Sequence, residues 1–112
     1  MPYIRVETNI DISDENFAAE LSKLTAGNVG KPESFVMVSV HDGLKMSFGG
    51  KTDPCALLTL KSLGLQASQC EGLSAALSGF IEDKLGVPAD RIFIEMDSHA
   101  PEMFGWNGGT FA

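Results

Sequence analysis

Apolar and polar residues alternate in four stretches of the chain, and this alternation predicts β-strands. The four stretches lie around Ile4, Val38, Leu58 and Ile94. Two other stretches carry apolar residues three or four positions apart, a spacing typical of amphipathic helices. The resulting order is strand, helix, strand, and then the same three elements again.

The first helix is predicted from about Asp14 to Ala26, with Ser13 as its N-cap. Gly27 and Gly30 mark its end. Its apolar stripe consists of Phe17, Leu21 and Leu24.

The second helix is predicted from about Gln69 to Leu85, with Ser68 and Glu71 as a capping box. Gly86 and Pro88 end it. Its apolar stripe consists of Leu73, Leu77, Phe80 and Ile81.

The chain also repeats itself. The segment from Gly30 to Val40 resembles the segment from Gly86 to Met96, half the chain further on. Each copy ends a strand–helix–strand unit, so the sequence predicts two βαβ repeats with parallel pairing inside each. Between the repeats we expect a short strand from Lys45 to Phe48 and then a loop to Pro54. The tail from Met103 to Phe111 is expected to add one more short strand.

The predicted strands have two different faces. One is almost wholly apolar and can meet both helix stripes; it carries Ile4, Val6, Val36, Val38, Val40, Leu58, Leu60, Ile92 and Ile94. The other mixes Tyr3, Phe35, Met37, Leu57 and Phe93 with Arg5, Glu7, Thr59, Lys61 and Glu95. Two helices cannot cover both faces, and a half-polar face suits a subunit interface. The alternative is a monomer with a patchy exposed face.

The composition and charge of the chain exclude several classes of function. The chain of 112 residues is predicted to form a single domain, residues 1–112. It carries 15 acidic and 8 basic residues, for a net charge of −7. This charge, without a Lys/Arg cluster, argues against binding to nucleic acid or to an anionic membrane. No signal peptide or membrane span is apparent, so a cytoplasmic protein is expected. Two distant cysteines do not form a metal site, and we expect no metal and no cofactor.

The amino terminus carries candidate chemistry. Pro2 follows Met1, and a small second residue favours removal of the initiator Met. Removal would leave Pro2 as a free secondary amine, which is a base when neutral, fixed to the first strand. The alternative is an ordinary start codon followed by a proline without a catalytic role.

Several short motifs carry a family resemblance: Gly30-Lys31-Pro32, Phe48-Gly49-Gly50, Asp53-Pro54-Cys55-Ala56-Leu57, Ser62-Leu63-Gly64, and Gly105-Trp106-Asn107 with Thr110-Phe111-Ala112. Together with Pro2 they resemble the macrophage migration inhibitory factor and D-dopachrome tautomerase family, over nearly the whole chain. The resemblance implies a four-stranded mixed sheet of α/β (α+β) type with two helices on one face. It also implies a homotrimer with a catalytic amino-terminal proline between subunits.

The family's reaction is keto–enol tautomerisation of arylpyruvates and dopachrome analogues. By resemblance Pro2 moves the proton, and Lys31 holds the carboxylate of a small aromatic keto acid. An apolar pocket would lower the pKa of the Pro2 amine and keep it neutral. The resemblance assigns the pocket walls to Leu63, Phe104, Trp106 and Phe111, with Phe93 and Glu95 facing the pocket from the neighbouring subunit.

Two departures put the strength of this activity in doubt. Phe93 stands where active relatives carry a tyrosine, and Glu95 where the inhibitory factor carries an asparagine. We expect the Glu95 carboxylate to raise the pKa of the Pro2 amine, unless Arg5 or Lys61 pairs with it. His41 and His99 are expected to be structural or solvent-exposed. A cytokine-like or other binding protein with a relic pocket is the alternative function; receptor binding and secretion without a signal peptide are open on this view.

Overall fold

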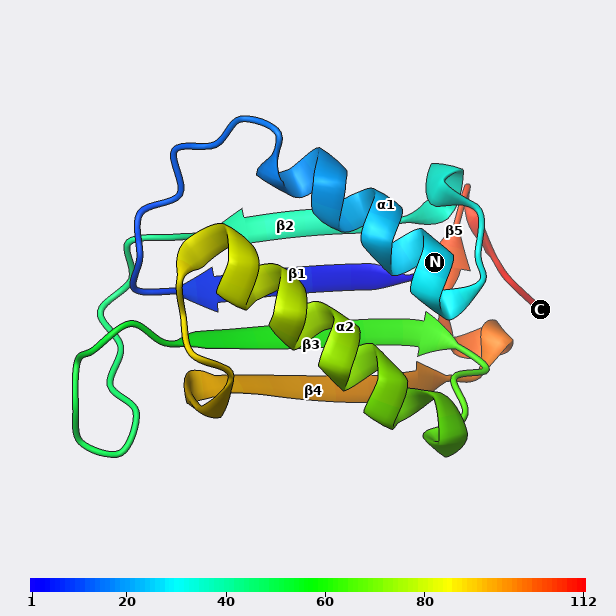
Figure 1. Cartoon of the computed structure of the whole chain (residues 1–112). Helices are drawn as coiled ribbons and strands as arrows, with labels where there is room; N and C mark the ends of the chain where they lie inside the picture. Colours follow the sequence, from blue (N-terminus) through cyan, green and yellow to red (C-terminus); the bar gives the residue numbers. More distant parts are fainter.

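The computed structural model describes residues 1–112. It contains a four-stranded sheet, two long helices and a small carboxy-terminal hairpin (Figure 1). The elements of the first half are β1 (Tyr3–Thr8), α1 (Phe17–Val29) and β2 (Met37–His41). Those of the second half are β3 (Ala56–Leu63), α2 (Ala67–Leu85), β4 (Ile92–His99), β5 (Gly105–Trp106) and β6 (Gly109–Thr110).

The sheet confirms the predicted pair of βαβ units. Its strand order is β2-β1-β3-β4. β1 runs parallel to β2, and β3 parallel to β4, whereas the central pair β1 and β3 is antiparallel. Both helices cover the same face of the sheet (Figure 1), and the other face, called the open face below, has no helix on it.

The core lies between the helices and the apolar face. Ile4, Val6, Leu58 and Leu60 from the two central strands are completely buried. Helix α1 adds Phe17 and Leu21, and α2 adds Leu73, Leu77 and Ile81. The rings of Phe17 and Phe80 join the two helices with centroids 5.3 Å apart. Because these side chains are packed under the helices, only the opposite face of each strand is available to contact a ligand or another chain.

The predicted start of α1 is wrong by three residues. The helix begins at Phe17 after Asn16, and not at Asp14 after Ser13. The Asp14 carboxylate instead accepts a hydrogen bond of 2.9 Å from the Asn16 backbone N–H, which stabilises a turn before the helix. Gly27 lies inside the helix, whereas Gly30 ends it with a left-handed backbone, φ 72°.

The predicted cap of α2 is also displaced. Helix α2 begins at Ala67, and its capping box is formed by Gln66 and Gln69 rather than by Ser68 and Glu71. The Gln69 side chain accepts a 2.9 Å hydrogen bond from the backbone N–H of Gln66. At the other end Gly86 adopts φ 69° and ends the helix as predicted.

Two expectations for the connecting segments require correction. No strand forms from Lys45 to Phe48; a single bridge joins Phe48 to Lys51 in a tight loop. The Arg91 side chain fixes this loop by donating hydrogen bonds to four of its backbone carbonyls. The tail forms two short strands, β5 and β6, rather than one.

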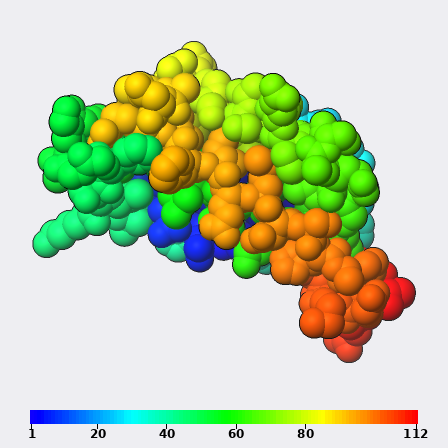
Figure 2. Space-filling model, turned by 90° about the horizontal axis from the view of Figure 1, so that it is seen from below, coloured from blue at the N-terminus to red at the C-terminus, as the bar shows by residue number.

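The open face mixes apolar and polar side chains, as the alternation predicts. Met37 is 66% exposed and Phe93 63% exposed on it. At one end of the sheet the carboxy-terminal segment projects beyond the open face, on the side away from the helices (Figure 2). This projection creates a corner between the sheet and the tail.

Candidate functional site

The corner between the open face and the tail contains a cavity of about 530 Å³. The amino terminus, the segment leading into β2 and the carboxy-terminal segment form it. Its lining residues are Met1, Pro2, Tyr3, Ser34, Phe35, Val36, Met37, Ser39, Phe104, Gly105, Trp106 and Phe111. The volume suits a small aromatic molecule.

Four aromatic side chains, called the aromatic wall below, form one side of the cavity: Phe35, Phe104, Trp106 and Phe111. Trp106 and Phe111 stack almost in parallel, with centroids 5.7 Å apart and planes at 11°. Phe35 meets Trp106 edge-on at 5.3 Å. Phe104 packs against Phe111 at 6.2 Å and against the His99 ring at 5.8 Å. The wall can therefore stack on a ligand ring.

The hairpin turn positions this wall. Asn107 and Gly108 have φ values of 53° and 78°, the left-handed backbone that a two-residue hairpin needs. The turn folds β6 back on β5, so that Trp106 lies opposite Gly109. The backbone N–H of Phe111 then donates to the carbonyl of Phe104 over 3.1 Å. The turn thereby brings together the aromatic side chains of the tail, which are several residues apart in sequence.

Pro2 is completely buried at the base of the cavity. Its carbonyl accepts a hydrogen bond of 3.0 Å from the Met37 backbone N–H, which ties the amino terminus to the entrance of β2. The Met1 ammonium donates a hydrogen bond to the carbonyl of Phe35. Burial, and then the positive charge of Lys31, lowers the pKa of this ammonium from its ordinary value of 8.0. The site therefore favours a neutral terminal amine.

The structure brings together Pro2, Phe104, Trp106 and Phe111 of the predicted site. Lys31 is exposed and does not line the cavity, although its charge acts on the terminal amine. Leu63 is half-buried at the end of β3, also outside the lining.

Phe93 and Glu95 lie far from Pro2 of their own chain. Phe93 is level with Glu7 across the sheet, whereas Pro2 precedes Tyr3 at the other end of β1. The four steps from Tyr3 to Glu7 span about 13 Å at roughly 3.3 Å per residue. Glu95 is level with Arg5 and lies two strands away from β1. Phe93 packs instead on Phe48, with centroids 4.6 Å apart, beside a second cavity. Within one chain, these two residues cannot complete the site.

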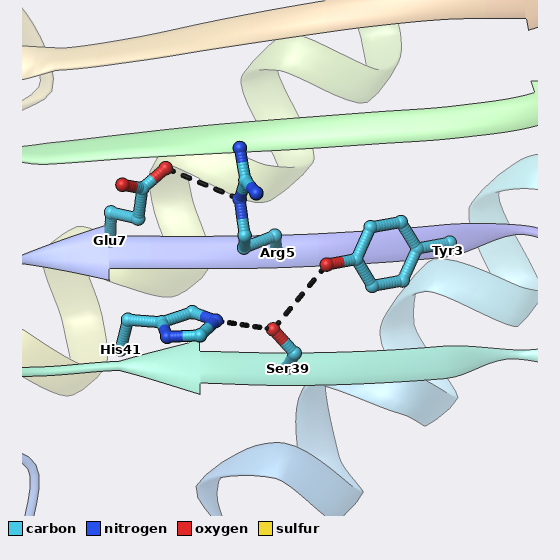
Figure 3. Close-up of polar contacts among 5 residues, drawn as sticks. All are labelled: Tyr3, Arg5, Glu7, Ser39 and His41. Atoms are coloured by element: carbon cyan, nitrogen blue, oxygen red, sulfur yellow. Dashed lines mark hydrogen bonds and ion pairs between the residues drawn. The ribbon is translucent and has the colours of Figure 1, made fainter.

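A polar chain that no sequence motif indicates begins in the cavity (Figure 3). The hydroxyls of Tyr3 and Ser39, which both line the cavity, are 3.5 Å apart. Ser39 Oγ is 2.7 Å from Nε2 of the exposed His41. Arg5 pairs separately with Glu7 at 3.2 Å, and not with Glu95. Only the strand register reveals this arrangement, because Tyr3 and Ser39 lie 36 positions apart in sequence.

The fold and the cavity define an α/β protein of two βαβ repeats with an aromatic cavity at Pro2. The sequence model of the macrophage migration inhibitory factor family matches residues 1–112. The chain therefore belongs to the macrophage migration inhibitory factor family.

Individual relatives are similar to this chain over its whole length. The chain is 36% identical to macrophage migration inhibitory factor of Rattus norvegicus, with all of both chains covered. It is 36% identical to the homologue of Brugia malayi, with 99% of each covered. A crystal structure of the Prochlorococcus marinus homologue superposes with a TM-score of 0.93 at 38% identity, covering 98% of this chain and 99% of that one.

Neither helix has the combination of length and apolar character needed to cross a membrane. No cluster of three or more His, Cys, Asp or Glu side chains is arranged to hold a metal ion.

Proposed function

We propose that this protein is a keto–enol tautomerase of arylpyruvates, with the Pro2 amine as its acid–base group once Met1 has been removed. The observation that carries the proposal is the position of Pro2, which is buried at the base of an aromatic cavity. While Met1 is present the Pro2 nitrogen is an amide and has no basic lone pair. Met1 also lines the cavity, so its removal would both free the base and enlarge the space.

The chemistry follows from the site. A neutral Pro2 amine takes a proton from the carbon between the ring and the carbonyl of the substrate. The resulting ammonium returns the proton to the enolate oxygen, or the reverse. An amine with a lowered pKa suits both steps, because an efficient acid–base group titrates near the working pH. The Met1 ammonium beside Pro2 has a lowered pKa, and we expect the same surroundings to lower the pKa of a Pro2 amine.

The substrate carboxylate needs a cation, and Lys31 is the candidate. Its charge is close enough to lower the pKa of the terminal ammonium. A flexible lysine can reach the mouth of the cavity when an anionic ligand is present.

The site is proposed to be shared among three copies of the chain. The open face is half apolar and uncovered, which suits contact with further copies. Phe93 and Glu95 can approach a Pro2 amine only when they belong to a neighbouring copy, as the register requires.

A second candidate function is cytokine-like binding, in which the cavity serves as a ligand site or a relic. The similarity to macrophage migration inhibitory factors favours it, since these relatives are named for a cytokine-like role. Phe93, which lacks the ring hydroxyl of the tyrosine in active relatives, also favours weak catalysis.

One assay separates the two functions. Phenylpyruvate enolisation is measured with the wild type and with Pro2→Ala, both shown by intact mass to lack Met1. A tautomerase that uses this amine should lose kcat/KM in Pro2→Ala, by less than the roughly 10²–10⁴-fold that a whole acid–base group contributes, because the variant keeps a primary amine at its start. Rates no higher than that of the uncatalysed reaction in both proteins would leave only the binding function.

A further inference from the structure

The turn between β5 and β6 contains a chemically labile pair of residues, Asn107 and Gly108. Asparagine is a labile side chain, and most of all when glycine follows, because no side chain then hinders the next backbone nitrogen. That nitrogen can attack the amide carbon and form a five-membered imide ring. Neither the Asn107 side-chain amide nor the Gly108 N–H makes a hydrogen bond, and both residues are exposed. The two reacting groups are therefore free.

The other three asparagines of the chain are held. The side chain of Asn9 makes three hydrogen bonds to the loop that precedes β3. The side chain of Asn28 donates to a backbone carbonyl of α1. Asn16 is followed by Phe17, which has a bulky ring and a backbone N–H that is already hydrogen-bonded. At each of these positions at least one of the two groups needed for ring closure is occupied.

Asp42 and Gly43 form a comparable pair in which both groups are occupied. The Asp42 carboxylate accepts a hydrogen bond of 2.7 Å from the backbone N–H of Ile12. The Gly43 N–H donates to the carbonyl of Ile10 over 3.0 Å. Ring closure here must first break both bonds, whereas the turn between β5 and β6 presents no such barrier.

The hairpin around Asn107 also opens easily. Its strands β5 and β6 have two residues each, and a two-stranded hairpin is marginally stable by itself. It belongs to the carboxy-terminal segment that projects from the body of the molecule (Figure 2). Asn107 is the only residue other than glycine with a positive φ, 53°, a backbone that asparagine tolerates at a cost. Local opening that brings the Gly108 nitrogen to the amide carbon is therefore accessible.

We propose that Asn107 is a site of spontaneous modification that releases the aromatic wall. The Gly108 nitrogen forms a bond to the side-chain amide carbon of Asn107, and the bond from that carbon to its own nitrogen breaks. The leaving nitrogen takes up the Gly108 proton and departs as ammonia. Water then opens the imide at either carbonyl. The products are aspartate and isoaspartate, in which the main chain runs through the former side chain.

Isoaspartate lengthens the main chain by one carbon atom inside a two-residue turn. The pairing of Trp106 with Gly109 depends on the length of this turn, and so does the stacking of Trp106 on Phe111. Both products also place a negative charge next to Trp106 in the sequence. We expect Trp106 to lose its stacking partner, so that the cavity loses part of one wall as the protein ages.

The test follows the purified protein during incubation in mildly alkaline buffer, beside a synthetic peptide of residues 102–112. Intact mass and peptide mapping measure the conversion. Asn107 should convert in the protein at a rate within about tenfold of that in the peptide, because a projecting terminal segment opens at little cost. Asn9, Asn16 and Asn28 should stay unchanged. An isoaspartyl methyltransferase should label position 107 and not Asp42. A rate about a hundredfold or more below that of the peptide would show that the folded turn protects Asn107, and would overturn the inference.

Asn107→Gly is the matched variant, since it removes the amide while glycine adopts a positive φ freely. Trp106 is the only tryptophan, so its emission reports the stacking directly and without any ligand. The emission should move to longer wavelength as the wild type converts and should stay constant in Asn107→Gly. Fresh Asn107→Asp, which carries the charge but not the longer main chain, should be shifted less than the converted wild type. Unchanged emission in protein that mass spectrometry shows to be converted would contradict the release of the wall.

Discussion

Trp106 and Phe111 stack at 5.7 Å with their ring planes only 11° apart, one on each side of the turn that joins β5 to β6. Each residue is part of the aromatic wall, and each depends on the other for its orientation. Trp106 is 53% exposed, so its free surface remains available for a ligand ring. The pair is therefore a stacking surface held in place before any ligand binds.

The first prediction concerns this pair. Phe111→Leu removes the stacked ring and should raise KM for phenylpyruvate about fivefold, since an aromatic pair contributes roughly 0.5–1.5 kcal/mol beyond its area. Far-ultraviolet circular dichroism should stay unchanged. Met103→Leu is the control, because Met103 is 77% exposed in the same tail and does not line the cavity. An unchanged KM in Phe111→Leu would contradict a role for the wall in binding.

The second prediction concerns Lys31 and the terminal amine. Burial is the larger cause of the lowered pKa, and the Lys31 charge is the smaller one. Lys31→Met should therefore raise the pKa part of the way back to its ordinary value. We expect Lys31 to act on the Pro2 amine of the processed protein in the same way, so that in Lys31→Met the rising limb of the kcat/KM profile moves to higher pH, because more of that amine is protonated. The KM for phenylpyruvate should also rise, because Lys31 is the proposed partner of the substrate carboxylate.

Lys23→Met is the control for this measurement, since Lys23 is an exposed lysine of α1. In the protein that retains Met1, the lowered pKa of the Met1 ammonium also affects the free energy of unfolding. Between the folded pKa and the ordinary value of 8.0 the unfolded chain binds more protons, so the free energy of unfolding rises with pH in this window. Lys31→Met should flatten that rise. A pH profile identical to wild type would show that Lys31 does not act on the amine.

The third prediction concerns Glu95. No ion pair forms between Glu95 and Arg5 or Lys61 in the chain, since Arg5 pairs with Glu7. A free carboxylate close to a neighbouring copy's Pro2 would stabilise the ammonium and raise its pKa. Glu95→Gln should therefore move the rising limb to lower pH and reduce KM for phenylpyruvate. The expected pH shift of the rising limb is opposite in sign to the one expected for Lys31→Met.

Glu71→Gln provides the comparison for Glu95→Gln, because Glu71 is exposed on α2 and the helices cover the other face of the sheet. If the two profiles coincide in midpoint and in KM, Glu95 has no electrostatic influence on the site.

The fourth prediction concerns the support of Phe93. Arg91 donates to the carbonyls of Phe48, Lys51, Asp53 and Pro54, and its guanidinium lies 5.3 Å from the centre of the Phe48 ring. Arg91→Met should lower the free energy of unfolding by about 1–3 kcal/mol, as expected for lost bonds to a charged donor. Lys51→Met is the control, and urea denaturation measures both. Equal midpoints for the two variants would refute this role.

The fifth prediction concerns assembly. Sedimentation at micromolar concentration should give three times the mass of one chain. Met37→Glu adds a charge to the most exposed apolar side chain of the open face and should reduce the mass toward that of one chain. Because Met37 also lines the cavity, the sedimenting mass and not the phenylpyruvate activity reports on the interface in this variant. A wild-type protein that sediments as a single chain would contradict both the interface and the shared site.

Much of the fold could be predicted from the sequence, because its signals are local and periodic. Leu58 and Leu60 alternate with Leu57 and Thr59, and this alternation fixes which face the helices cover. The helix starts were less predictable, since several residues near each start can cap. Gln66 and Gln69 cap α2, although Ser68 had the more usual chemistry.

The lining of the cavity was predicted in part. Phe104, Trp106 and Phe111 lie in one short tail, and the motif that carries them identified them together. Tyr3 and Ser39 were missed because neither belongs to a motif and only the β1–β2 register joins them. The alternation had placed Tyr3 on the open face, but the position of Ser39 beside it depends on a pairing that no local pattern specifies.

The most direct test of the account compares two preparations of the same wild-type chain, one fully processed and one with Met1 retained by inhibiting methionine aminopeptidase. Intact mass establishes the state of each, and phenylpyruvate enolisation is the readout. The account predicts that activity belongs to the processed protein and falls at least a hundredfold when Met1 remains, because the Pro2 nitrogen is then an amide. Equal activity in the two preparations would contradict the role of Pro2 as the base.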